Sequence, residues 1–144
     1  MKHKRILAMI LAVASCLSLA VGASAANTTT RKATDFRDYD RTAWYAEAVS
    51  AAVDNGLLYG KSSTIIDPNG DMTRAEMAAI INRSFGCYAK ADISKYKDVS
   101  KDKWYFEDVA MAVQMGTYNG RSNTAMAPDA PISRQEAMTV VARA

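Results

Sequence analysis

The 144-residue sequence contains a single histidine, His3, and two cysteines, Cys16 and Cys87. His3 lies in a segment that we expect to be removed on export. A chain without histidine has neither a histidine-based catalytic triad nor a histidine-ligated metal. Neither repeat offers a paired acid and base beyond residues that helix capping already explains. We therefore expect a protein that is not an enzyme and that uses no cofactor or metal.

Residues 1–25 have the pattern of a secretory signal peptide. Three cations precede an almost wholly apolar stretch over residues 6–21, and Ala-Ser-Ala at 23–25 is a small-x-small cleavage pattern. The apolar stretch is short for a membrane span and has no stop-transfer charges behind it. We expect cleavage after Ala25, a secreted product and no membrane span in the mature chain. Cys16 ends "VASC", which leaves a lipoprotein as the alternative, although an apolar run follows it.

The charge balance of the mature chain argues against nucleic-acid binding. Removing Lys2, Lys4 and Arg5 with the signal leaves 15 Lys and Arg against 15 Asp and Glu, so the mature chain is formally neutral and lacks a basic footprint. Cys87 is then the one remaining cysteine, which excludes an internal disulfide. No histidine is present to activate its thiol, so a packing role or a cross-link between two chains fits it better than catalysis.

The chain repeats itself with a period of 60 residues. Residues 36–84 align with residues 96–144 without a gap, and 15 of the 49 pairs are identical. The identities cluster in motifs, which indicates two copies of one structural unit. They include the pairs Asp38 and Asp98, Trp44 and Trp104, Tyr45 and Tyr105, Gly56 and Gly116, Gly60 and Gly120, Pro68 and Pro128, Arg74 and Arg134, and Glu76 and Glu136.

Each unit is predicted to be a helix, an ordered loop and a second helix. Apolar residues recur at helical spacing from Tyr45 to Val53 and again from Met77 to Phe85. We expect Thr42 and Asp102 to cap the first helices at their N-termini. Gly56 and Gly116 should end those helices in a left-handed conformation.

Neither unit has enough apolar surface to be stable alone. We therefore predict an all-α fold in which two helix-loop-helix units share a helical core. The predicted boundaries are a linker over 26–35, the first repeat over 36–86, a linker over 87–95 and the second repeat over 96–144.

The stretch "DPNGDMTRAEMAAIINR", residues 67–83, resembles a calcium loop at first sight, with alternating oxygen-bearing side chains. An EF-hand loop also requires glycine at its sixth position and glutamate at its twelfth, where this chain has Met72 and Ala78. The second copy loses two of the three side-chain ligands. A capping box explains the stretch better, because Thr73 to Glu76 and Ser133 to Glu136 both read S/T-x-x-E.

Arg74 and Arg134 occupy the first helical turn, where the helix dipole disfavours a cation. A specific partner is therefore expected. One alternative is a salt bridge to Asp38 or Asp98, or to a carboxylate of the adjoining unit. The other is an anionic ligand, since a guanidinium can hold a carboxylate through two parallel hydrogen bonds. Trp44 and Trp104 offer a similar choice between a core position and a platform for a sugar ring.

Each unit resembles an S-layer homology (SLH) repeat. The resemblance rests on the entries "FRD" and "YKDV", the tryptophan at the first helix, the paired glycines four residues apart and the loop proline. It also rests on "MTRAEMAAIINR" and "ISRQEAMTVVAR", which match a signature that usually reads ITRAE. Together these motifs extend from residue 36 to residue 144.

The resemblance implies non-covalent attachment to the bacterial cell surface. SLH domains bind secondary cell-wall polysaccharides that often carry a pyruvate ketal, and the signature arginine meets its carboxylate. Carried over, Arg74 and Arg134 would bind the anionic group and Trp44 and Trp104 would pack at the groove. Gly60 and Gly120 would let the backbone approach the sugar, and Asp38 and Asp98 would order or line the groove. The second signature reads SRQE, which keeps the arginine.

The number of repeats departs from the family pattern. SLH domains typically assemble three repeats, and this sequence holds two. We expect either a piece of a longer protein with a further repeat or a chain that completes its core by self-association. The alternative to polysaccharide binding is a structural protein whose repeats mediate protein association in the cell envelope.

Overall fold

The computed structural model describes residues 31–144. The predicted signal peptide, Cys16 and the first part of the predicted linker lie outside the described residues. The described chain contains four α-helices, one short 3-10 helix and no strand, which confirms the all-α prediction. No helix in residues 31–144 is long and apolar enough to cross a bilayer. The elements are η1 (Ala33–Asp35), α2 (Ala46–Asp54), α3 (Arg74–Phe85), α4 (Phe106–Gln114) and α5 (Arg134–Arg143).

The second helix of each repeat begins with the predicted capping box. Thr73 Oγ1 accepts a hydrogen bond from the Glu76 N–H, and the Glu76 carboxylate accepts one from the Thr73 N–H. Ser133 and Glu136 make the same reciprocal pair at the start of α5. Two of the orphan amides at each helix start are thereby satisfied.

The first helix of each repeat begins later than predicted, and the predicted N-caps were wrong. The residues that precede α2 and α4 are Tyr45 and Tyr105, and neither makes a side-chain cap. Thr42 instead donates its N–H and its hydroxyl to Asp40 Oδ1, at 2.8 and 2.7 Å. Asp102 accepts the hydroxyl of Ser100. Both predicted caps therefore close a local turn ahead of the helix, a competing use of short polar side chains.

The other ends of α2 and α4 are as predicted. Gly56 and Gly116 follow these helices with φ of +68° and +79°, in the left-handed region that favours glycine. The chain then turns into the loop that leads to the second helix of the repeat.

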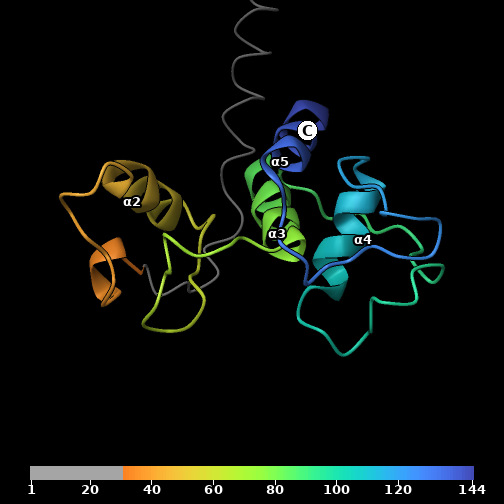
Figure 1. The fold of residues 1–144 in the computed structure, drawn as a ribbon, viewed down its shortest axis with the longest axis horizontal. Coiled ribbons are helices and arrows are strands. Elements are labelled where there is room, and N and C mark those ends of the chain that lie inside the picture. The colour runs from red at the N-terminus through yellow and green to blue at the C-terminus, as the bar shows by residue number, and fades with distance from the viewer. Residues whose placement is uncertain (1–30) are drawn as a thin grey trace, which may run out of the picture. The chain divides into compact units, whose positions relative to one another are not determined.

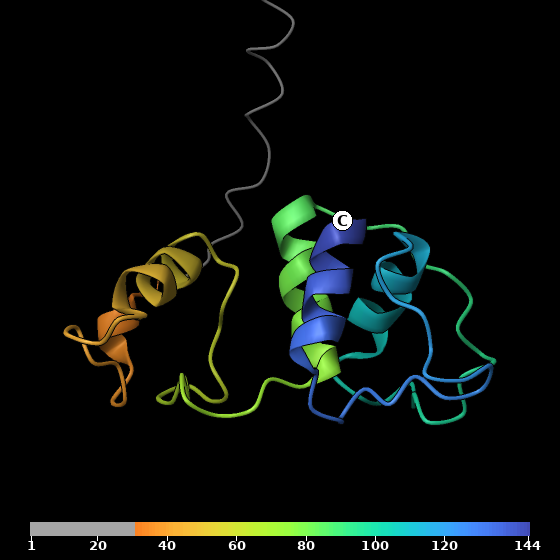
Figure 2. The same ribbon diagram turned by 45° about the horizontal axis from the view of Figure 1, so that its top comes forward.

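The two repeats share a core because α3 packs on α4 (Figures 1 and 2). Ala75, Ala78 and Ile81 of α3 join a buried cluster whose other members come from the second repeat and its lead-in segment, Tyr118 and Val140 among them. The first repeat keeps a smaller cluster of its own, formed by Ala33, Phe36, Val53 and Ile66. The buried apolar residues of α3, the second helix of repeat 1, therefore pack in the core of repeat 2.

The predicted linkers contribute to these cores. Ala33 is 1% exposed and Ile93 is 3% exposed, and the two residues are 60 positions apart. The structural equivalence of the repeats therefore begins several residues before the sequence match at residue 36. Ala33 and Ile93 are apolar residues within otherwise largely polar segments, and this was the signal in the sequence.

Candidate functional site

The loop of each repeat is held by the aspartate at its entry. Asp38 accepts hydrogen bonds from the N–H groups of Ile66 and Asp67, at 2.9 and 2.6 Å. The bond from Ile66 is the main reason that the pKa of Asp38 lies below its ordinary value. Asp98 accepts equivalent bonds from Met126 and Ala127. The two aspartates thus order the loops that frame the grooves.

Gly60 and Gly120 allow each loop to approach an aromatic ring of its own repeat. A Cβ on Gly60 would lie 2.6 Å from the Ile65 carbonyl oxygen and 2.6 Å from a ring carbon of Phe36. A Cβ on Gly120 would lie 2.5 Å from a ring carbon of Tyr96. Both contacts are too short for any side chain, so packing alone requires glycine here.

Arg74 enters the second repeat and is enclosed there, with 5% of its surface exposed. Its Nη1 donates to Glu136 Oε1 at 2.9 Å, Nε donates to the Met126 carbonyl at 3.0 Å, and Nη2 donates to the Asn119 carbonyl at 3.1 Å. The guanidinium also lies over the ring of Tyr118, 5.1 Å from its centroid. Of the two alternatives for this arginine, the structure contains the contact with a carboxylate of the adjoining repeat.

The backbone around Arg74 continues this contact. The N–H groups of Arg74 and Ala75 donate to the carbonyls of Ala130 and Pro128, at 3.0 and 2.9 Å. In return, the N–H of Ile132 donates to the Met72 carbonyl at 2.9 Å. We call the groups of repeat 2 that make these bonds the socket, and the start of α3 the plug. The socket consists of the Glu136 carboxylate, the carbonyls of Asn119, Met126, Pro128 and Ala130, and the Ile132 N–H.

Arg134 has the same position in repeat 2 but a different environment. It is exposed, and its side chain makes no hydrogen bond or ion pair within residues 31–144. The signature arginines, identical in sequence, therefore differ completely in burial.

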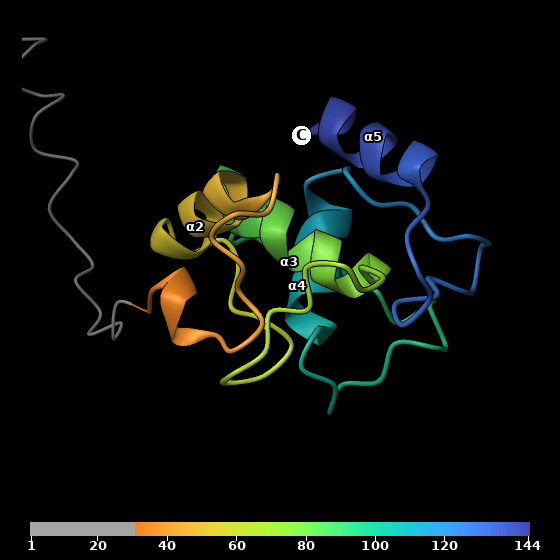
Figure 3. The same cartoon turned by 60° about the vertical axis from the view of Figure 1, so that its left-hand side comes forward.

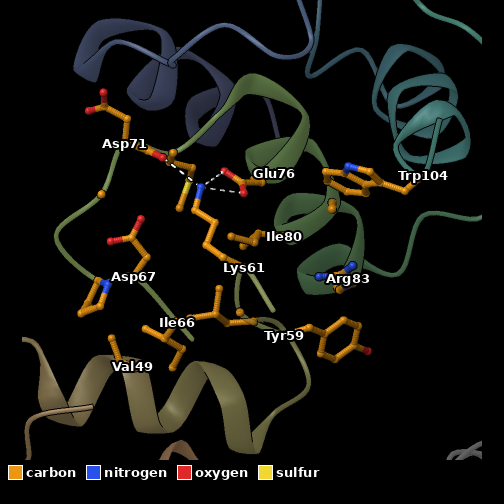
Figure 4. A pocket seen from close by; sticks show the side chains of 16 residues that line it. Val49, Tyr59, Lys61, Ile66, Asp67, Asp71, Glu76, Ile80, Arg83 and Trp104 are labelled. Carbon is orange, nitrogen blue, oxygen red and sulfur yellow. Dashed lines mark hydrogen bonds and ion pairs between the residues drawn. The ribbon is translucent and has the colours of Figure 1, made fainter. Parts of the chain in front are cut away.

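Groove 1 lies in the first repeat between the loop and α3 and has a volume of about 570 Å³ (Figure 4). Lys61 spans it, with Nζ 2.7 and 2.8 Å from the two oxygens of Glu76. Arg83 lies above the ring of Tyr59, 4.1 Å from its centroid. Two cations, Lys61 and Arg83, face three carboxylates, Asp67, Asp71 and Glu76, so groove 1 carries a net negative charge.

Groove 2 is the equivalent space in the second repeat, with a volume of about 310 Å³. Arg74, Arg121 and Arg143 line it with a single carboxylate, Glu136, so its net charge is positive. Arg121 donates to both oxygens of Glu136, at 3.2 Å each. The Ser133 N–H, Arg121 and Arg74 lower the pKa of Glu136 to about 2, the backbone bond from Ser133 being the largest cause. Asn119, Gln135 and Thr139 add uncharged polar groups.

The model of the S-layer homology domain matches residues 35–78 and 95–138. The chain belongs to the S-layer homology family. Both matches fall on the repeats, and each includes the loop, the capping box and the signature arginine. The resemblance in the sequence is thereby confirmed, and SLH domains are typical of proteins anchored at the cell surface.

Several curated relatives share the SLH segment. The chain is 35% identical over 113 residues to the "Surface-layer 125 kDa protein" of Lysinibacillus sphaericus, covering 76% of this chain and 10% of the relative. It is 27% identical over 143 residues to an "Endoglucanase" of Bacillus sp. (strain KSM-635), covering 98% and 15%. It is 28% identical over 116 residues to a "Cell surface protein" of Thermoanaerobacter kivui, covering 77% and 15%. The chain thus spans 10 to 15% of the length of these relatives.

The structure separates the predicted site residues of the SLH repeats into groups. Arg74 and Gly120 line groove 2, and Gly60 and Trp104 line groove 1. The remaining predicted residues, Arg134, Trp44, Asp38 and Asp98, line neither groove. Trp44 is 94% exposed and Trp104 is 60% exposed, so neither belongs to a core. Each packs edge-to-face on the tyrosine that follows it.

Two pairs of basic residues in the SLH grooves were missed by sequence reasoning. Lys61 and Arg121 follow the loop glycines, and Arg83 and Arg143 occupy the last turn of α3 and α5. The members of each pair are 60 positions apart. Arg83 and Arg143 are identical, and Lys61 and Arg121 share only their positive charge. The internal alignment contained this signal, but the distance along the sequence hid that Lys61 and Arg83 line groove 1 together and that Arg121 and Arg143 line groove 2 together.

Proposed function

We propose that this protein attaches non-covalently to the bacterial cell surface by binding secondary cell-wall polysaccharide that carries pyruvate ketals. Groove 2 is the proposed binding site. The observation that carries the proposal is its charge, with Arg74, Arg121 and Arg143 opposed by Glu136 alone. A carboxylate on a glycan is the ligand chemistry that such a groove favours.

The three arginines have different roles in this proposal. Arg74 is held by protein acceptors and supplies a fixed charge at the base of the groove. Arg143 is exposed and its side chain makes no hydrogen bond or ion pair within the described chain, so it is free to hold a carboxylate through two hydrogen bonds. Arg121, with 44% of its side chain exposed, can exchange one bond to Glu136 for a bond to the ligand. Gln135 and Thr139 would accept and donate to sugar hydroxyls.

The proposed role is binding without catalysis. Glu136 is the carboxylate of groove 2, and with a pKa of about 2 it stays ionised at neutral pH. A general acid or base works best with a pKa near the pH of the reaction. The relatives support the same role, because a surface-layer protein and an endoglucanase share this segment although their names describe different activities.

Co-sedimentation with purified cell-wall sacculi tests the proposal. The protein should sediment with intact sacculi and stay in solution with sacculi stripped of their secondary polysaccharide. Equal sedimentation with both would reject the proposal and favour the alternative, a structural protein that associates with other proteins of the envelope.

The variant Arg143→Ala tests the site itself. It should raise the Kd for intact sacculi by about tenfold or more, as expected for the loss of a charge-assisted hydrogen bond of ~1.5–3 kcal/mol. Arg37→Ala is the matched control, because Arg37 is exposed and its side chain makes no contact by hydrogen bond or ion pair in residues 31–144. Undiminished binding of Arg143→Ala would exclude groove 2.

A further inference from the structure

Repeat 1 contains a socket equivalent to the one that Arg74 fills in repeat 2. The corresponding atoms, 60 positions earlier, are the Glu76 carboxylate, the carbonyls of Tyr59, Ile66, Pro68 and Gly70, and the Met72 N–H. Within residues 31–144, Met72 N–H and the carbonyls of Ile66, Pro68 and Gly70 make no hydrogen bond. The Tyr59 carbonyl accepts from Arg31 at 3.3 Å and retains a second lone pair. The first socket is therefore formed but lacks the arginine that the second contains.

The start of α5 is the equivalent plug of repeat 2, and within residues 31–144 it enters no socket. Arg134 is exposed, and the N–H groups of Arg134 and Gln135 donate to no acceptor within the described chain, unlike those of Arg74 and Ala75. On the same helix, Met138 and Val141 are 65% and 50% exposed. Their equivalents on α3, Ala78 and Ile81, are 0% and 5% exposed because they pack against repeat 2. Figure 3 shows α5 at the periphery of the described helices.

The size and charge of groove 1 fit a missing arginine. Its volume is about 570 Å³, against about 310 Å³ in groove 2, where Arg74 is present. Its net charge is negative, which complements the cation at the start of α5. The shapes also correspond. α5 has the larger Met138 where α3 has Ala78. The socket of repeat 1, socket 1, has the smaller Leu58 where repeat 2 has Tyr118. Ala78 and Tyr118 belong to one buried cluster.

We propose that the start of α5 in one copy of this chain inserts into socket 1 of a second copy. Arg134 of the first copy then donates to Glu76 and to the carbonyls of Tyr59 and Ile66 of the second copy. Its backbone N–H and that of Gln135 donate to Gly70 and Pro68. Each of these bonds has a counterpart that exists between the repeats of a single chain. The contact between copies therefore continues an interface that the molecule already uses.

The proposed contact is heterologous, since one copy provides a plug and the other a socket. The described residues of every copy leave one plug and one socket unused, so association proceeds to a closed ring or to an open chain. The same step explains the exposure of Trp44. Within one chain, Trp104 of repeat 2 lies at groove 1 of repeat 1 (Figure 4). Trp44 of the next copy would lie at groove 2 in the same way.

Light scattering coupled to gel filtration tests the proposal on the purified protein, without cell wall, so that its failure leaves the proposed function untouched. The mass of the wild type should exceed that of one chain and rise with concentration. Arg134→Glu should elute as a monomer. Arg37→Glu changes an exposed arginine of repeat 1 by the same charge and should associate like the wild type. A monomeric wild type, or Arg134→Glu that still associates, would overturn the proposal.

A mixing experiment keeps the test independent of folding defects. Ile80 lines groove 1, and its equivalent Val140 is buried in the cluster that also contains Ala75 and Ala78 of α3, so Ile80→Glu should block the socket and leave the plug intact. Arg134→Glu blocks the plug and leaves the socket intact. Each variant alone should be monomeric, whereas a mixture of the two should form one-to-one dimers that grow no further. Two folded variants that fail to pair when mixed would contradict the plug-and-socket contact.

Discussion

Arg74 and Glu136 form an ion pair between residues that lie 62 positions apart, with 2.9 Å between Nη1 and Oε1. The arginine is the first residue of α3, and the glutamate completes the capping box of α5. One side chain therefore links the helix start of one repeat to the helix start of the next. The bond also joins folding to the proposed function, because both residues line groove 2.

Arg74→Ala should be far more destabilising than Arg134→Ala. Loss of Arg74 removes an ion pair and leaves the carbonyls of Met126 and Asn119 without a donor, which we expect to lower the free energy of unfolding by about 3 kcal/mol. Arg134 is exposed, so its removal should change that free energy by less than about 0.5 kcal/mol. Urea unfolding at dilute protein concentration, where the chain is monomeric, measures both. Equal losses would contradict the assigned burial of Arg74.

Gly60→Ala and Gly116→Ala separate backbone conformation from packing. Both glycines have positive φ, at +82° and +79°. A Cβ on Gly116 meets nothing within 4 Å, whereas one on Gly60 meets the Ile65 carbonyl and Phe36. Gly116→Ala should therefore cost about 1 kcal/mol from conformation alone, and Gly60→Ala should cost clearly more. Urea midpoints at equal slope decide between them, and a Gly60→Ala protein as stable as Gly116→Ala would show that the loop can move away from the ring.

The pH dependence of stability should contain a contribution from Glu136. Its folded-state pKa of about 2 lies below the ordinary glutamate value of 4.5, so between these two values the unfolded state binds more protons. The stabilisation is complete above pH 4.5 and disappears as the pH falls toward 2. Glu136→Gln, which can keep the capping box, should be less stable at neutral pH and should lose less stability on acidification.

Urea unfolding between pH 2 and pH 6 compares this variant with the wild type. Glu47→Gln is the control, because Glu47 is exposed and makes no hydrogen bond or ion pair within residues 31–144. The control should follow the wild-type pH profile. A Glu136→Gln profile parallel to that of the wild type would mean that the carboxylate gains nothing from its partners in the folded state.

The sequence predicted those features that depend on neighbouring residues. The capping boxes at Thr73 and Ser133 and the left-handed glycines at 56 and 116 are settled within one helical turn, and the structure contains all of them. The N-caps failed although they are local, because Thr42 had a closer acceptor in Asp40. Alternative hydrogen-bond partners of a short polar side chain differ little in free energy, and residue spacing does not show which partner is favoured.

The features that sequence reasoning could not settle depend on how one repeat packs on the next. Spacing left Arg74 with two alternatives because nothing in a linear pattern places Glu136 beside it. The internal alignment also could not show that Arg74 and Arg134, each the first residue of a helix with the same capping box, differ in burial. That difference arises because α3 has a following repeat to pack on and α5 has none within the described chain.

The fluorescence of Trp44 should report the proposed contact between copies. Trp44 is 94% exposed in the single chain, while Trp104 is 60% exposed beside the neighbouring repeat. In the variant Trp104→Phe, Trp44 is the one remaining tryptophan. Its emission should shift to the blue as the protein concentration rises, because groove 2 of the neighbouring copy removes water from the indole ring. Adding Arg134→Glu should abolish the shift. Association seen by light scattering without any change in emission would place the contact on another surface. When the plug of one copy enters socket 1 of the next, Trp44 of that next copy must come to lie at groove 2 of the first.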